Sequence, residues 1–493
     1  MSSMPAKAWK KMGFKKAMNV LKATGKKVPA YRNFLRENNF NPDDKTTYTP
    51  ENFFKLPVMD KKNYILKYPF KDLCFDLDEI YTIERSSGYS NLVVFWPRLP
   101  EEDALFPSYI EYAFVQFYGI DKKRTLAITT LALGTWVSGE KMAQALRMTA
   151  VKKKYKLTVI SPGTNLEDTL EAVKNLSQNF DQTIIVGYPP FIKTVIDEGE
   201  RQGIDWKKVN LKIGLGGEGY SEAYRETMAK KIGLDEKNLL GISGGYGAAD
   251  LGMTIGREYP ITVAIRKLAD KDKKLCQLLF KSQTVPSLLQ YNPSTCFIEE
   301  KNGELLFTIK AGIPVIRYNI HDRGGVAEFD EMIKSLEQGG YNIIKELNKY
   351  GYSKKDIWQL PFFYIFGRSD GTISVSGMNL YPENIEAALN NRETSMVNSF
   401  KIREEITSDQ GEKFCIALEL KTGITPPAGN DLETEKKRYQ KIFLDKILTV
   451  NKDFKYVYDA RPEQMKPVIE IHAFGEGPFA QDKGKIKRSY IER

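Results

Sequence analysis

A short turn rich in hydroxyl groups, Ser86-Ser87-Gly88-Tyr89-Ser90, has residue types that can hold a phosphate. Small residues let several backbone N–H groups point at one oxyanion, and the serine hydroxyls add further donors. Loops of this kind usually also carry a second glycine and a basic side chain, but Asn91 and Leu92 stand at those places. Taken alone, the segment is as consistent with a plain turn before a strand as with a phosphate site.

Two glycine-rich segments match catalytic patterns incompletely. Gly214–Gly219 fits G-x-G-x-x-G, but a dinucleotide site also needs an acidic residue at the end of the next strand, and Asp235 precedes that strand. Gly241–Gly245 fits the G-x-S-x-G nucleophile elbow, which needs a histidine late in the chain. The chain has two histidines, His321 and His472, so a hydrolase is a weak interpretation. Both runs are better explained as backbone that approaches one flat ligand.

Length and composition are those of a multidomain globular enzyme. The 493 residues suggest two to four domains, and 42% are hydrophobic, without a stretch long enough for a membrane span. The net charge of +10 favours anionic partners without choosing among them. A basic N-terminal stretch could contact nucleic acid or a membrane surface, but a solvated helix that packs Trp9 and Leu21 inward is the favoured interpretation.

Cysteine usage and the N-terminal sequence indicate the cell compartment. The four cysteines lie far apart, which argues against a disulfide framework or a zinc cluster; they are Cys74, Cys276, Cys296 and Cys415. The N-terminus has no apolar signal core followed by small residues. We therefore expect a cytoplasmic protein.

The pattern of apolar residues predicts an α/β fold with a second, smaller domain. From about residue 120, strand-like and helical segments alternate every 25–30 residues, which is typical of βα units and a largely parallel sheet. From about residue 285 the segments shorten into β-hairpins, with Asn302-Gly303 as one turn. A strand and a helix that begins at Pro382 follow, so Phe366–Asp370 is interpreted as a boundary before an α+β domain.

Taken in order, these motifs resemble those of the adenylate-forming superfamily of acyl- and aryl-CoA synthetases, within it the phenylacetate-CoA ligase-like branch. The resemblance covers about residue 30 to the end, and the joint order of the motifs is more specific than any one of them. It includes the lead-in "FFKLPVMDKKNYILKYPF", "GGYGAADLG", "GIPVIRYNIHDRG", "IFGRSDGTISVSGMNLYPENIE" and "GKIKR". It implies a helical lead-in at 1–80, an adenylation core at 81–369, and a mobile C-terminal domain at 370–493, joined by a hinge.

The resemblance assigns the nucleotide site. It implies that ATP and AMP are bound by Ser86, Ser87, Gly88, Tyr89, Ser90, Gly217, Glu218, Tyr246, Gly247, Asp322 and Arg368. Tyr246 would stack on adenine, and Asp322 would accept both ribose hydroxyls, which suits a side chain that only accepts. Asp250 would hold Mg²⁺, although the family usually has a glutamate there. Loss of the loop lysine, now Leu92, should weaken contacts to the β- and γ-phosphates.

The remaining assignments concern the acid, the thiol and the transition state. The acyl pocket is implied to include Trp136, Tyr188, Pro189, Gly216 and Gly245, and an aromatic lining suits an aromatic or flat acid. Gly377 stands where pantetheine passes close to the backbone, and Asp370 is the hinge. Lys485, selected by its Gly-Lys-Ile-x-Arg frame, would stabilise the charge that develops between carboxylate and α-phosphate.

The function implied is an ATP-dependent acid–thiol ligase that forms an acyl-AMP, releases pyrophosphate and then makes a CoA thioester. Its partners would be a small carboxylic acid, ATP, CoA as co-substrate and Mg²⁺, with no nucleic acid. One alternative is an adenylating enzyme that passes the acyl group to an amine or a carrier-protein thiol. Another is a catalytically degenerate nucleotide-binding protein, motivated by Leu92 and Asp250. The resemblance also suggests a homodimer formed through the N-terminal segment.

Overall fold

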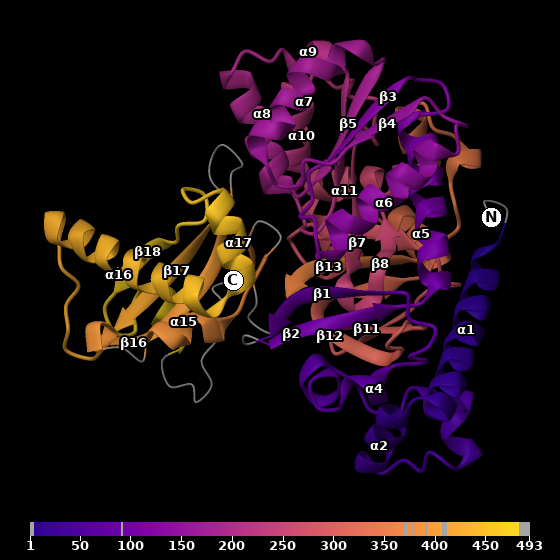
Figure 1. Ribbon diagram of the computed structural model, residues 1–493, viewed down its shortest axis with the longest axis horizontal. Helices are drawn as coiled ribbons and strands as arrows, with labels where there is room; N and C mark the ends of the chain where they lie inside the picture. Colours follow the sequence, from indigo (N-terminus) through magenta and orange to yellow (C-terminus); the bar gives the residue numbers. More distant parts are fainter. Residues whose placement is uncertain are drawn as a thin grey trace. The chain divides into compact units, whose positions relative to one another are not determined.

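The chain forms two compact units in the computed structural model, which describes residues 4–89, 92–368, 373–375, 378–389, 392–406 and 412–482. The first unit comprises Met1–Ser86 with Val94–Gly367, and the second comprises Ser87–Val93 with Arg368–Arg493. Figure 1 shows both units and labels many of their helices and strands.

The first unit begins with helices that pack on one end of its sheet. They are α1 (Ala6–Lys27), α2 (Pro29–Glu37), α3 (Pro50–Phe53) and α4 (Phe70–Leu73), with short turns of helix at Lys45–Tyr48 and Lys61–Ile65. Trp9 and Leu21 of α1 are buried, as the apolar pattern predicted. Because this face of α1 is covered by protein, its lysines are left to the solvated side.

Five parallel strands form one half of an 11-stranded sheet. In sheet order they are β7 (Ile242–Ala248), β6 (Leu211–Leu215), β5 (Gln182–Gly187), β3 (Thr125–Thr129) and β4 (Leu157–Ile160). The connecting helices are α6 (Val137–Val151), α7 (Leu166–Leu176), α8 (Pro189–Arg201), α9 (Trp206–Val209) and α10 (Glu222–Lys231). Figure 1 shows α7, α8 and α10 on one side of these strands and α6 on the other. Cover on both faces explains why β3 and β5 are buried throughout.

The other half of the sheet contains β8 (Gly252–Arg257), β9 (Ser287–Tyr291), β13 (Phe362–Arg368), β12 (Val315–Ala327), β11 (Glu304–Ile309) and β10 (Phe297–Lys301), in that order away from β7. β10 and β11 form the predicted hairpin; Asn302 and Gly303 both have positive φ, as a tight hairpin turn requires. Helices α11 (Pro260–Lys271), α12 (Lys273–Phe280), α13 (Phe329–Gln338) and α14 (Ile343–Asn348) contribute to a separate hydrophobic cluster beside this half.

A separate pair of strands, β1 (Thr82–Tyr89) and β2 (Leu92–Arg98), carries the predicted phosphate loop. Helix α5 (Pro100–Ala113) and a turn of π-helix at Phe114–Tyr118 lead from β2 to the parallel strands. The second unit holds β14 (Ile373–Val375) with β15 (Met378–Leu380), and the sheet of β16 (Val397–Ile406), β17 (Glu412–Leu420) and β18 (Val468–His472). Its helices are α15 (Pro382–Leu389), which begins at the predicted proline, α16 (Gly429–Val450) and α17 (Lys452–Ala460).

Two further observations bear on the sequence predictions. Each of the four cysteines is buried, and within the described part of the chain none of them forms a disulfide. Among the described helices, none combines the length with the apolar character that crossing a bilayer requires.

Candidate functional site

The glycine-rich segments meet at the level of the sheet where the parallel pairing of β5, β6 and β7 ends, with Leu215 opposite both Gly187 and Gly244. Gly187 ends β5, Gly216 follows β6 directly, and the two glycines pair through a 3.2 Å hydrogen bond from the Gly216 N–H to the Gly187 carbonyl. The neighbouring strand β7 carries Gly244 and Gly245. Parallel strands place their carboxyl ends at one edge of a sheet, so the fold brings both glycine runs together, where α/β proteins bind ligands.

Space beside two of these glycines is not filled by protein. A Cβ added at Gly216 would come no closer than 3.8 Å to the Gly245 carbonyl oxygen, and one added at Gly245 no closer than 3.6 Å to the Gly256 carbonyl oxygen. These are ordinary contact distances, so protein packing does not require glycine at either position. Gly245 is also exposed. A ligand that lies flat on this backbone would explain both residues.

At Gly217, unlike at Gly216 and Gly245, the packing of neighbouring residues does require glycine. Its φ is +84°, and an added Cβ would lie 2.6 Å from two ring carbons of Tyr188. The Tyr188 ring is buried, and its hydroxyl lies 2.8 Å from the Ser138 hydroxyl at the start of α6. The turn after β6 and the residue after β5 are therefore packed against each other without room for a methyl group.

The other predicted acyl-pocket residues are also largely buried. Trp136 precedes α6, and the Arg85 guanidinium lies 4.7 Å from its ring centre. Pro189 is the first residue of α8, and its carbonyl accepts a 2.6 Å hydrogen bond from the Tyr224 hydroxyl. Each of these residues thus has a packing role, and of the predicted aromatic rings Tyr188 is the one in contact with the glycine edge.

Tyr246 and Asp322 meet across the sheet. The Tyr246 hydroxyl donates to Asp322 Oδ2 at 2.5 Å, a length typical of a hydroxyl bonded to a carboxylate. Tyr246 lies on β7 and Asp322 on β12, which is four places away in the sheet. In a flat sheet four strand spacings of about 4.8 Å would separate them by about 19 Å. The antiparallel half must therefore curl over, and Tyr246 packs edge-on against Phe363 of β13 at 5.6 Å between ring centres.

Asp250, the predicted metal ligand, is buried and already contacts two side chains. Its Oδ2 accepts a 2.7 Å hydrogen bond from the Tyr318 hydroxyl and lies 3.5 Å from the Lys61 ammonium. Among the described residues, Oδ1 has no hydrogen-bond partner. One carboxylate oxygen with phosphate oxygens and water is a sufficient ligand set for Mg²⁺ in nucleotide sites. The donor set therefore fits the metal, but the Lys61 charge reduces the field that would attract it.

The base of the predicted phosphate loop is fixed by a buried charge cluster. The Ser86 hydroxyl accepts a 3.0 Å hydrogen bond from the Trp96 indole. Arg98 follows Trp96 by two residues on β2. Its guanidinium donates to Glu84 Oε2 at 2.6 Å and to the Ala249 carbonyl at 2.6 Å. The second contact joins β2 to the residue before Asp250. Within the first unit, Arg98 thereby links Glu84 of β1 to the segment that contains the candidate metal ligand.

Four of the predicted site residues, Ser90, Asp370, Gly377 and Lys485, lie outside the described residues, as does Asn91. Ser87, Gly88 and Tyr89 belong to β1, and Arg368 is the half-buried last residue of β13. Glu218 lies half-buried on the turn after β6, and Gly247 lies on β7. Their predicted roles remain predictions.

A buried ion network beneath the glycine edge was missed by sequence reasoning. Glu258 Oε1 lies 2.6 Å from Arg225 and 2.7 Å from Arg266, and Glu222 binds the same two guanidiniums. Burial disfavours the Glu258 carboxylate, but the two guanidiniums outweigh it and lower its pKa to about 2. Glu258 Oε2 also accepts a 2.8 Å hydrogen bond from the Gly244 N–H. The network therefore holds the glycine strand β7 to α10 and α11.

Lys61 and Tyr318 were also missed as neighbours of Asp250. Lys61 belongs to the lead-in motif and Tyr318 to the "GIPVIRYNIHD" motif, and the two segments pair directly. The Asn319 N–H donates to the Met59 carbonyl at 2.7 Å, and the Met59 N–H donates to the Arg317 carbonyl at 3.3 Å. Because both motifs carry the resemblance, their pairing could have been suspected from the sequence.

The second unit contains a cluster of side chains of the kinds that bind metals, and its two carboxylates both contact one arginine. Glu405, Cys415 and Glu470 offer ligand atoms within 4.8 Å of one another. Arg403 donates to Glu405 at 2.6 Å and to Glu470 at 2.5 Å, and this hydrogen bond is the main cause of the lowered pKa of Glu470. The carboxylates are thus organised by a guanidinium.

Comparison with known proteins gives relatives of one kind. The chain is 27% identical over 214 residues to a phenylacetate-coenzyme A ligase of Aromatoleum evansii, a match covering 43% of this chain and 39% of the relative. It is 22% identical over 380 residues to that of Pseudomonas putida and 21% identical over 387 residues to that of Escherichia coli K12. These matches cover 73% and 74% of this chain, and 70% and 72% of the relatives. No family model matches.

Solved structures share the fold over the whole chain. A 2-hydroxyisobutyryl-CoA ligase in complex with its acyl-AMP and CoA aligns with a TM-score of 0.60, at 14% identity, over 99% of this chain and 90% of that one. The same ligase in a postadenylation state aligns with a TM-score of 0.53, at 14% identity, over 100% and 90%. The predicted α/β fold class is confirmed. The predicted resemblance is confirmed as well, because the sequence relatives carry the name of the predicted branch.

Proposed function

We propose that this chain, which resembles the phenylacetate-CoA ligase-like branch of the adenylate-forming enzymes in sequence and fold, is an ATP-dependent acid–thiol ligase. In the first step a substrate carboxylate attacks the α-phosphate of ATP. The bond to pyrophosphate breaks, and acyl-AMP and pyrophosphate form. In the second step the CoA thiol attacks the acyl carbon, loses its proton and displaces AMP.

The observation that carries this proposal is the meeting of three predicted features in the first unit. The open backbone faces of Gly216 and Gly245 lie at one sheet edge, and Tyr246 of the same strand β7 is bonded to Asp322. The open faces of these two glycines would accept a flat acyl group, and Tyr246 with Asp322 would hold the adenine and the ribose. Together these features support recognition of an acyl-adenylate.

Each residue would act on a different part of the nucleotide. Asp322, which accepts from the Tyr246 hydroxyl, would also accept the ribose hydroxyls, since an ionised carboxylate has about four acceptor sites. The strand β1, bound at Glu84 by Arg98, would present the backbone N–H groups of the phosphate loop. Lys485, on a mobile C-terminal domain, would stabilise the charge that develops at the reacting carboxylate and α-phosphate.

Asp250 is the residue proposed to hold Mg²⁺, through Oδ1. When bound there, the ion would neutralise part of the triphosphate charge. Lys61, 3.5 Å from the other oxygen of Asp250, would add a positive charge to the same region. That second charge offers a physical reason why a phosphate loop with leucine in place of lysine could still serve.

The acid itself is proposed to be aromatic or small. Tyr188 lies against Gly217, which leaves little room at that wall, and the buried Trp136 would add a second aromatic ring. The relatives named for phenylacetate are in keeping with an aryl acid. Cytoplasmic location and a homodimer through the N-terminal segment remain part of the same proposal.

The test is acid-dependent exchange of labelled pyrophosphate into ATP across a library of aryl and short-chain carboxylic acids. Exchange with at least one acid is expected, because the adenylation step is reversible. With that acid, AMP release that depends on CoA supports the ligase. AMP release that depends on an amine or a carrier-protein thiol supports acyl transfer to that acceptor instead.

One alternative is favoured by a specific observation. The ion pair of Lys61 with Asp250 occupies the position proposed for the metal ligand, and Leu92 replaces the loop lysine. A protein that binds nucleotide without turnover would show both changes. Measurable ATP binding with no pyrophosphate exchange for any acid in the library would establish that alternative and contradict the ligase.

A further inference from the structure

A pocket of about 380 Å³ lies at the opposite edge of the parallel strands from the candidate nucleotide site. Its basic residues are Lys122 and Lys123, just before β3, and Lys212, the second residue of β6; Asn238, before β7, also lines it. All four therefore belong to the amino ends of the strands. From Lys212 to Gly216 the strand advances about 13 Å, at about 3.3 Å per residue, so this pocket is separate from the glycine edge.

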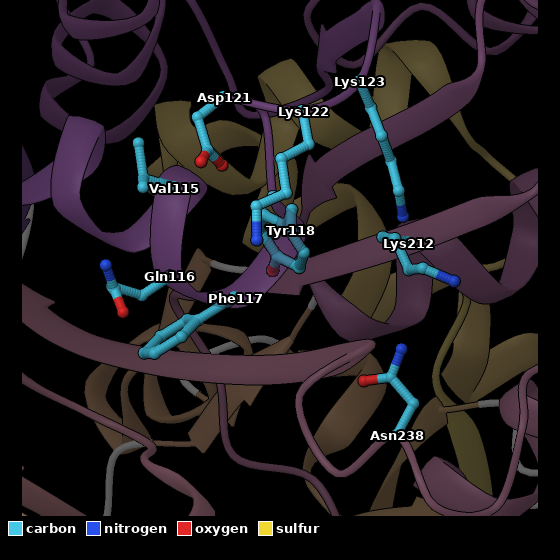
Figure 2. A pocket seen from close by; sticks show the side chains of 10 residues that line it. Val115, Gln116, Phe117, Tyr118, Asp121, Lys122, Lys123, Lys212 and Asn238 are labelled. Carbon is cyan, nitrogen blue, oxygen red and sulfur yellow. The ribbon is translucent and has the colours of Figure 1, made fainter. Parts of the chain in front are cut away.

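The lining carries an excess of positive charge. Against three lysines the lining has one acid, Asp121, and outside the lining the carboxylate of Asp235 acts on Lys212. Within the described part of the chain, none of the three lysines forms a salt bridge. Figure 2 shows Lys122 and Lys123 extending down from the segment before β3, with Lys212 below Lys123 and the Asn238 amide facing upward. Several donors of hydrogen bonds thus border one space.

Lys212 is the most constrained of the three. It is half-buried on the strand, and its ammonium donates to the Asn210 side chain at 3.3 Å. Burial, followed by the like charge of Lys123, lowers the pKa of Lys212. A charged group in such surroundings is stabilised by any anion that enters the pocket. Electrostatics therefore favour an anionic occupant over a neutral one.

The wall of the pocket is held in place before any ligand binds. The Tyr118 hydroxyl donates to the Ile213 carbonyl at 3.3 Å and lies 3.0 Å from the Ser243 hydroxyl. The Tyr118 carbonyl accepts a 2.8 Å hydrogen bond from the Gln182 amide. Beside it, Phe117 adds an apolar surface. A preformed site loses less freedom on binding than a flexible one.

We propose that this pocket binds a small phosphate-bearing anion with at least two negative charges. A phosphate group offers several acceptor oxygens around one centre, which matches three ammonium groups and an amide better than a single carboxylate does. The volume exceeds that of one phosphate group, and Phe117 provides a surface for an organic part. The ligand is therefore either an inorganic oligophosphate or a phosphate monoester.

Site-resolved lysine labelling tests this proposal on the full-length protein. Lysines are acetylated with limiting reagent in the presence of inorganic pyrophosphate, phenyl phosphate, or sodium chloride at equal ionic strength, and each lysine is followed by peptide mass spectrometry. We expect one phosphate compound to protect Lys123 and Lys212 but not Lys334, an exposed lysine of α13. Stronger protection by pyrophosphate indicates the inorganic source, and stronger protection by phenyl phosphate indicates a monoester.

A variant without the three lysines provides a second test of the proposal. The triple change Lys122→Gln, Lys123→Gln and Lys212→Gln should weaken binding of the protecting compound at this site by at least about tenfold, because charge-assisted hydrogen bonds are lost. Lys334→Gln should leave it unchanged. Because labelling is read lysine by lysine, pyrophosphate bound at the candidate nucleotide site does not disturb the result. Equal labelling with phosphate compounds and with sodium chloride overturns the proposal, as does equal protection of Lys334.

Discussion

Tyr246 on β7 and Asp322 on β12 are joined by a 2.5 Å hydrogen bond although three strands separate them in the sheet. The bond brings the "GGYGAADLG" and "GIPVIRYNIHDRG" motifs, 76 residues apart at these positions, to one place. Asp322 is buried, so its carboxylate depends on such donors. The relationship makes Asp322 the residue at which nucleotide recognition is most directly tested.

Asp322→Asn should weaken AMP binding by about 10- to 100-fold. The change keeps the size of the side chain but replaces a charged acceptor, and a hydrogen bond to a charged group contributes about 1.5–3 kcal/mol. Isothermal titration with AMP measures the dissociation constant. Asp330→Asn, at an exposed position of α13, is the matched control and should leave it unchanged. An unaltered dissociation constant in a folded Asp322→Asn protein would remove Asp322 from the nucleotide site.

Gly217→Ala should reduce acid-dependent pyrophosphate exchange by at least about tenfold, since small displacements of positioning groups have large effects on rate. The matched control is Gly340→Ala. Both glycines have φ near +85° (84° and 86°), so alanine adds about 1–2 kcal/mol of left-handed strain at each. Only at Gly217 does the new methyl group meet another residue, the Tyr188 ring. Equal loss of exchange in the two variants would attribute the effect to strain and not to the Tyr188 wall.

Glu258→Gln should destabilise the protein and make its stability less sensitive to acid. Removing one partner of a buried ion network costs about 3–5 kcal/mol, because the other charges lose their counterion. The folded-state pKa of Glu258 is about 2, below its ordinary value of 4.5. The carboxylate therefore stabilises the fold above about pH 4.5, and this contribution is lost as the pH falls toward 2.

The measurement for Glu258 is the midpoint of thermal unfolding, recorded from pH 6 down to pH 3. This series enters the interval from about pH 4.5 to about pH 2, in which protonation of Glu258 lowers the stability of the fold. Wild type should lose more of its midpoint over this range than Glu258→Gln, which has no carboxylate to protonate. Glu337→Gln, at an exposed position of α13, should follow wild type. A slope in Glu258→Gln as steep as that of wild type would mean that Glu258 is not the group whose protonation matters.

Asp250→Asn should raise the apparent Mg²⁺ requirement of pyrophosphate exchange by about tenfold, because the candidate ligand loses its charge. Tyr318→Phe is the matched control: it removes the hydrogen bond to Asp250 Oδ2 and keeps the carboxylate. It should change the Mg²⁺ requirement far less. If both variants shift it equally, the hydrogen bond and not the metal contact is responsible.

The sequence predicted elements and their order better than contacts between them. Local signals located the helix at Pro382 and the turn at Asn302-Gly303, because proline and positive-φ residues act within a few positions. The network of Glu258 with Arg225 and Arg266 was invisible, because charged residues on an amphipathic helix ordinarily face solvent. Only the close packing of α10 and α11 under β7 makes them a buried network.

The same limit applies within the candidate site. Asp322 and Tyr246 were predicted to bind one nucleotide, but their direct bond follows from the curl of the sheet, which depends on long-range strand pairing. The contact of Asp250 with Lys61 joins residues almost 190 positions apart, and nothing local specifies it. Residue types thus indicated the chemistry, while partners and distances required the fold.

Lys485→Ala should abolish acyl-AMP formation while leaving thioester formation from supplied acyl-AMP within a few-fold of wild type. A lysine that stabilises developing charge at the α-phosphate acts only in the first step, and loss of one such group typically lowers the rate by about 10²–10³-fold. The two half-reactions are measured separately, by acid-dependent pyrophosphate exchange and by CoA thioester formation from synthetic acyl-AMP. Lys483→Ala, which removes the same charge outside the Gly-Lys-Ile-x-Arg frame, should retain both. Equal loss of the two half-reactions in Lys485→Ala would show that the lysine supports folding or general binding, and its assignment to adenylation would then be wrong.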